Sequence, residues 1–123
     1  MKPVSNPYAR GVMGEIAAEK ALTEAGLEVL ERRFRGGRGE IDLILLQPGK
    51  ALVFAEVKAR EKASPEEAMA AITPAKQKRL LEAACFYLAK HPEFQNLPLR
   101  FDAVTVTPEG VRHIPNAFEP AYD

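Results

Sequence analysis

A chain of 123 residues predicts one domain, residues 1–123, built around a single hydrophobic core. Its seventeen basic and seventeen acidic residues cancel, so any nucleic-acid binding must come from a local patch. The single cysteine excludes an intrachain disulfide and a Cys-based zinc site. An apolar signal core and an uncharged run of membrane-spanning length are both missing, so we expect a soluble, cytoplasmic protein.

The first predicted element is a helix over residues 7–25, after Ser5 or Asn6 and before Gly26. At 100° per residue, one side of it gathers Tyr8, Val12, Ala18, Leu22 and Ala25. Glu15 falls in the middle of that apolar side. It either sits at the edge of the face and reaches water, or points over the sheet towards the acidic residues described below.

Residues 27–34 are typical of a strand, and an Arg/Gly segment follows them. Arg35 and Arg38 in this segment are candidates for phosphate contacts, because the guanidinium fork matches phosphate oxygens. The simpler interpretation is a solvated turn between two strands, and taken alone the segment favours that turn.

Two apolar runs, Ile41–Leu46 and Ala51–Val57, flank Pro48-Gly49-Lys50 and predict a hairpin in the middle of a sheet covered on both faces. A three-residue loop predicts the facing pairs Gln47–Ala51, Ile44–Phe54, Asp42–Glu56 and Glu40–Lys58. A two-residue loop would instead place Asp42 opposite Ala55.

If Asp42 and Glu56 face each other, their like charges destabilise the hairpin. With Lys58 nearby, the two carboxylates are instead a suitable binding site for a divalent cation. If Glu15 lies above them, three carboxylates share one pocket, and we expect at least one raised pKa in the metal-free protein. The alternative is that Lys58 or a backbone amide satisfies Asp42. Lys58 also has a structural alternative, a salt bridge to Glu40 across the hairpin.

A charged connection leads from Arg60 to a short helix capped by Ser64, and Thr73-Pro74 begins a longer helix that ends near His91. Its apolar face is formed by Leu80, Leu81, Ala84, Tyr87 and Leu88, and we expect Cys85 to be packed in the core. Gln77 lies within the apolar face, where it either reaches the Asp42 site or satisfies a backbone group.

Residues 99–107 alternate as a strand, in which Asp102 is predicted to be a buried partner for a basic residue. A final short strand, residues 111–114, precedes a tail. His91 and His113 are not spaced as a metal pair, and we expect both on the surface. The order is therefore αβββαβ, with a short extra helix before the second main helix and a last strand appended.

Asp42, thirteen residues, and then Glu56-Val57-Lys58 resemble the core motif of the PD-(D/E)XK nuclease superfamily. The element order is similar to its restriction-endonuclease-like α/β fold, a mixed central sheet flanked by helices. Glu15 matches the first-helix acid of the archaeal Holliday-junction resolvase branch. With GEIDLI, EVKAR and ITPAKQKRL, nearly the whole chain resembles the bacterial YraN-like family. Ile41 departs from the motif, which has a proline there.

The resemblance implies hydrolysis of DNA phosphodiester bonds, with branched or repair-intermediate DNA as a candidate substrate and Mg²⁺ or Mn²⁺ as cofactor. Glu15, Asp42, Glu56 and Lys58 would be catalytic, and Asp42, Glu56 and the carbonyl of Val57 would hold the metal. Arg35, Arg38, Arg60 and Gln77 would contact the substrate. The alternative is a non-catalytic module that binds DNA or another protein; junction resolvases of similar fold act as homodimers.

Overall fold

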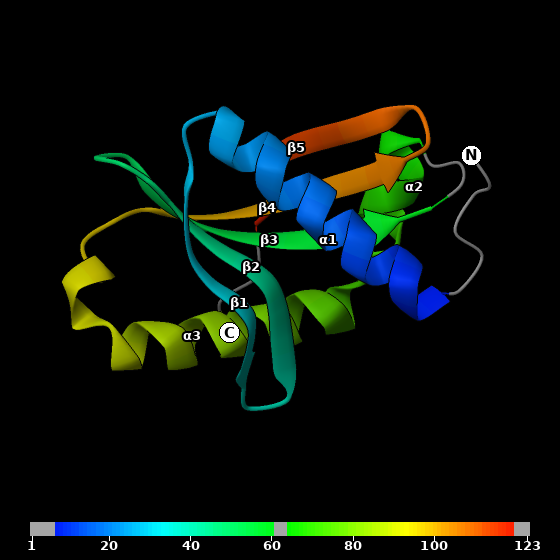
Figure 1. Cartoon of the computed structure of the whole chain (residues 1–123). Coiled ribbons are helices and arrows are strands. Elements are labelled where there is room, and N and C mark those ends of the chain that lie inside the picture. Colours follow the sequence, from blue (N-terminus) through cyan, green and yellow to red (C-terminus); the bar gives the residue numbers. More distant parts are fainter. Residues whose placement is uncertain (1–6, 61–63, 120–123) are drawn as a thin grey trace.

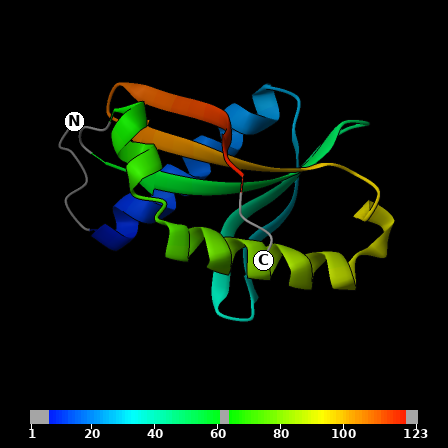
Figure 2. The same ribbon diagram turned by 180° about the vertical axis from the view of Figure 1, so that it is seen from behind.

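A five-stranded sheet in the order β1-β2-β3-β4-β5 forms the centre of the computed structural model, which describes residues 7–60 and 64–119. Helix α1 covers one face of the sheet and helix α3 covers the other (Figures 1 and 2). The elements are α1 (Pro7–Glu24), β1 (Glu28–Gly36), β2 (Gly39–Gln47), β3 (Ala51–Ala59), α2 (Pro65–Ala70), α3 (Pro74–Lys90), a 3-10 turn (Pro92–Phe94), β4 (Leu99–Thr107) and β5 (Gly110–Phe118). This confirms the predicted order.

The helix ends follow the capping signals of the sequence. Gly26, with a φ of 95°, terminates α1 at its C-terminal end. The hydroxyl of Ser64 accepts the N–H of Glu67 at the start of α2, and that of Thr73 accepts the N–H of Lys76 at the start of α3. The proposed caps of α1, Ser5 and Asn6, and the side chain of Tyr8 lie outside the described part of the chain.

The hairpin of β2 and β3 has the predicted register, from Gln47↔Ala51 through Ile44↔Phe54. Strand β3 then pairs with β4 in parallel, which requires a long crossover, and α2 and α3 supply it. Strand β5 is longer than predicted. Its pairing with β4 shifts register between Ala103↔Ile114 and Phe101↔Phe118, and Pro115 lies in that irregular stretch.

Each face of the sheet carries its own apolar cluster. Leu43, Leu45 and Val53 pack with α1, whereas Ile44 and Phe54 pack with α3, which confirms that the central strands are covered on both faces. The buried residues of α3 are Leu80, Ala83, Ala84 and Tyr87. The prediction for Cys85 is wrong: it is exposed, because it lies on the solvent side of α3.

Glycines set how closely the helices approach the sheet. A Cβ on Gly39 would overlap the carbonyl oxygen of Arg79, so α3 lies directly against the start of β2. A Cβ on Gly14 would lie 2.8 Å from the Cβ of Ala59, so α1 is equally close to the end of β3. None of the helices within residues 7–60 and 64–119 is long and apolar enough to cross a membrane.

Candidate metal and phosphodiester site

Asp42 lies where the β2–β3 ladder ends. The last ladder pair is Leu43↔Ala55, so the predicted Asp42–Glu56 and Glu40–Lys58 pairs do not form. Instead the Oδ2 atom of Asp42 accepts the backbone N–H of Val57 at 2.8 Å. This is the backbone-amide alternative of the sequence analysis, and it fixes the carboxylate beside Glu56.

Glu56 is the least satisfied polar group of the site. Its side chain is 7% exposed, and its buried Oε2 atom has no hydrogen-bond partner within the described residues. Burial, and then the neighbouring carboxyl group of Asp42, raise the pKa of Glu56 to about 8, although Lys76 and Lys58 oppose the shift. The expected raised carboxyl pKa is therefore found here.

Two lysines flank the carboxylates. The Nζ atom of Lys76 lies 3.5 Å from the Oε2 of Glu56. The adjacent amine of Lys76, and then partial burial, lower the pKa of Lys58, against the pull of Glu56 and Asp42. The structural alternative for Lys58, a salt bridge to Glu40, is not found: Glu40 instead forms an ion pair with Arg35, with an N–O distance of 3.2 Å.

The sequence pattern did not indicate Lys76 as a residue of the site; it indicated the next residue, Gln77, instead. The side chain of Gln77 satisfies a backbone group: its Nε2 atom donates to the carbonyl of Ile72 at 3.2 Å. This is the second of the two roles considered for Gln77. The available signal was spacing: Lys76 lies four residues before Leu80, so both lie on the same side of α3. Leu80 is buried, which brings Lys76 over the sheet.

An open pocket of about 300 Å³ lies between the β1–β2 turn and α3. It is lined by Arg38, Gly39, Glu40, Asp42, Glu56, Lys76, Arg79 and Leu80. Carboxylates therefore lie beside a set of cations, an arrangement that suits a metal ion next to a phosphate.

Glu15 lies away from these residues. Its carboxylate accepts hydrogen bonds from Arg33 Nε at 3.0 Å and Nη2 at 2.8 Å, and Glu19 binds Arg32 in the same way one turn later. Consecutive strand residues normally point to opposite faces, but Arg33 has a φ of 52°, which turns both arginines towards α1. The structure thus brings two of the three predicted carboxylates together.

The predicted substrate-binding arginines are exposed on the surface. Arg35 pairs with Glu40, and Arg38 at the pocket pairs with Glu82 of α3 at 3.3 Å. Arg60 donates to the carbonyl of Ala59 and lies outside the pocket lining. Of these three, Arg38 alone lines the pocket.

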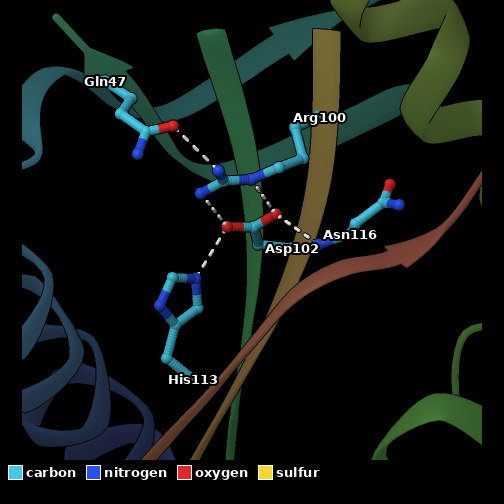
Figure 3. Close-up of polar contacts among 5 residues, drawn as sticks. All are labelled: Gln47, Arg100, Asp102, His113 and Asn116. Carbon is cyan, nitrogen blue, oxygen red and sulfur yellow. Dashed lines mark hydrogen bonds and ion pairs between the residues drawn. The ribbon is translucent and has the colours of Figure 1, made fainter. Parts of the chain in front are cut away.

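A second polar cluster surrounds Asp102, which is fully buried as predicted (Figure 3). Its carboxylate receives two hydrogen bonds from Arg100, one from the N–H of Asn116 and one contact of 2.7 Å with His113 Nε2. Burial pushes the pKa of Asp102 upward, but His113, Arg100 and Asn116 together hold it below its usual range. His113 is therefore a half-buried partner of Asp102 and not a free surface histidine.

The donor set near Asp42 fits a hard divalent cation. No group of three or more His, Cys, Asp or Glu suited to a metal occurs in the part of the chain that the structure describes. Mg²⁺, however, commonly uses one or two carboxylates, with waters and substrate phosphates as its other ligands. Asp42 and Glu56, whose Oε2 atom accepts no hydrogen bond from the described residues, supply those two carboxylates.

Sequence comparison connects the chain to one family. A model described as "Uncharacterised protein family UPF0102" matches residues 14–106. A UPF0102 protein of Rhodopseudomonas palustris strain BisB18 is 41% identical over 113 residues, covering 91% of this chain and 82% of its own. One from Saccharophagus degradans is 42% identical, covering 88% and 91%, and one from Alcanivorax borkumensis is 45% identical, covering 77% and 75%.

Among solved structures, SfsA of Pyrococcus furiosus, in complex with Ca²⁺, is similar with a TM-score of 0.34 and 15% identity. The match covers 91% of this chain and 63% of that chain. Values this low assign no function to the present protein.

Proposed function

This chain belongs to the UPF0102 family, and we propose that it hydrolyses DNA phosphodiester bonds with a divalent cation held at Asp42 and Glu56. The observation that carries the proposal is the buried Glu56 Oε2, which has no hydrogen-bond partner in the described chain and lies at a pocket. A buried carboxylate oxygen that accepts no hydrogen bond, with only the Nζ atom of Lys76 at 3.5 Å, costs folding free energy and is retained most readily where a ligand satisfies it.

In the proposed reaction, different residues of the site bind the metal and orient the attacking water. Asp42 and Glu56 would hold the cation, with the carbonyl of Val57 as a third protein ligand. Mg²⁺ or Mn²⁺ would polarise the phosphate and stabilise its developing negative charge. Lys58, whose pKa is lowered by Lys76 and by partial burial, orients the attacking water at the phosphorus. The water oxygen bonds to phosphorus and releases a proton to solvent, the P–O3′ bond breaks, and the leaving O3′ takes up a proton from solvent, so the products carry a 5′-phosphate and a 3′-hydroxyl.

DNA is the substrate class that the surroundings of the carboxylates favour. Arg38, Lys76 and Arg79 line the same pocket as the carboxylates, so a phosphate beside the metal meets cations on the side of α3. With no net charge on the whole chain, this local set supplies the attraction. Arg35 and Arg60, which are both exposed, would extend the contacts along the DNA backbone.

The test is cleavage of end-labelled single-stranded, duplex, flapped and four-way DNA in Mg²⁺ or Mn²⁺. We expect cleavage of at least one of these substrates and a 5′-phosphate on the product. Glu56→Gln and Lys58→Gln should each lower the rate at least about 100-fold, the scale of a lost proton-transfer or charge-stabilising group. Lys50→Gln, at the exposed hairpin turn, is the matched control and should cleave at the wild-type rate.

Calorimetry of Mn²⁺ binding separates the enzyme from a non-catalytic module. If the wild type cleaves no DNA and binds no Mn²⁺, the proposal is refuted. The scaffold would then be a binding module for DNA or another protein. Because four-way junctions have two-fold related strands, the molecular mass should also be measured by light scattering with and without junction DNA, where we expect two copies per junction.

A further inference from the structure

Lys76 occupies the position of a counter-ion inside the candidate site. Its ammonium nitrogen lies 3.5 Å from Glu56 Oε2, and its side chain is 26% exposed, so it reaches inward along the pocket wall. Its backbone is fixed, because its N–H donates to the capping hydroxyl of Thr73 at 3.2 Å. Only the side chain is therefore free to rearrange.

A divalent cation and Lys76 compete for the same carboxylate oxygen. Mg²⁺ lies about 2.1 Å from its oxygen ligands, so an ammonium that stayed near Glu56 would face a double positive charge within a few ångströms. The flexible stem of a lysine allows the ammonium to leave. Arg38 and Arg79 line the same pocket, so a DNA phosphate bound beside them would offer the ammonium a new partner.

We propose that Lys76 is an exchangeable partner of Glu56, which pairs with the Oε2 atom of Glu56 in the metal-free protein and contacts a DNA phosphate once a divalent cation takes its place. This inference rests on the proposed function and adds a coupling to it. The cation releases a positive charge for DNA, and bound DNA holds Lys76 away from the metal ligands. Metal binding and DNA binding therefore strengthen each other by the same factor.

The first experiment measures Mn²⁺ binding by calorimetry without DNA. Lys76→Met keeps most of the aliphatic stem and removes the competing charge, so it should bind Mn²⁺ about tenfold more tightly than the wild type. Lys76→Arg keeps the charge and should bind as the wild type does. Lys78→Gln, on an exposed neighbouring position of α3, is the matched control. Unchanged or weaker Mn²⁺ binding by Lys76→Met would overturn the inference.

The second experiment measures DNA affinity by fluorescence anisotropy, with and without Ca²⁺, on a labelled duplex shown by gel to stay intact. Ca²⁺ should strengthen binding to the wild type by about tenfold, and most of that gain should be absent in Lys76→Met. An equal Ca²⁺-dependent gain in both proteins would contradict a phosphate contact by Lys76.

The proposed function and the role of Lys76 are refuted by different results. A wild type that neither binds Mn²⁺ nor cleaves DNA refutes the proposed function and this inference together. A wild type that does both, alongside a Lys76→Met variant with unchanged metal affinity, refutes the role of Lys76 alone. Circular dichroism of each variant establishes that it is folded, and Lys76→Arg still tests the charge requirement if Lys76→Met does not fold.

Discussion

Replacing Glu56 by Gln should stabilise the metal-free protein, and the gain should grow with pH. The pKa of Glu56 is raised from 4.5 to about 8, so the folded state retains a proton on this group that the unfolded state releases. The stability linked to that proton is fully present below pH 4.5 and is lost as pH rises towards 8. Integrating over the two pKa values gives a loss of about 3 kcal/mol by pH 7 and on the order of 4 kcal/mol between pH 5 and pH 9.

The assay is urea unfolding at pH 5, 7 and 9 in the presence of a chelator, followed by circular dichroism. The free energy of unfolding of Glu56→Gln minus that of the wild type should rise by several kcal/mol across this range. Glu109→Gln, at the exposed β4–β5 turn, is the control and should show no such rise. A constant difference between Glu56→Gln and the wild type at all three pH values would refute the raised pKa.

The same two proteins also test the metal. Mg²⁺ that binds only the folded state should raise the unfolding free energy of the wild type, by about 2.7 kcal/mol at one hundred times its dissociation constant. Glu56→Gln should gain much less, because it lacks one of the two carboxylates. Equal stabilisation of both proteins would show that Mg²⁺ binds elsewhere.

Two further predictions concern the scaffold. On α1, Gly14→Ala should destabilise the fold by about 1–3 kcal/mol because its Cβ would meet Ala59. Gly11→Ala, with open space around it, should stabilise the fold by about 0.5–1 kcal/mol. Thermal unfolding of both variants tests this, and equal shifts in melting temperature would contradict the close packing at Gly14. Asp102→Asn should cost about 3 kcal/mol at pH 7. Because the pKa of Asp102 is lowered, its contribution is lost as pH falls through that value, so urea unfolding should show a smaller difference at pH 3 than at pH 7.

Local signals in the sequence determined most of the fold. Turn length placed Ile44 opposite Phe54, capping hydroxyls placed the starts of α2 and α3, and alternation placed Asp102 in the interior. These features depend on neighbouring residues and on the periods of strand and helix, which a single sequence displays. The proximity of Asp42, Glu56 and Lys58 followed from the hairpin alone, because all three belong to its two strands.

The remaining features depended on contacts between elements distant in sequence. The rotation of α3 about its axis, with Gly39 against its backbone, brought Lys76 to Glu56 and left Cys85 in solvent. A single positive φ turned Arg33 towards Glu15, which does not line the pocket. Helix rotation and approach distance follow from the complementarity of whole packed surfaces, and the sequence pattern of one helix does not specify them.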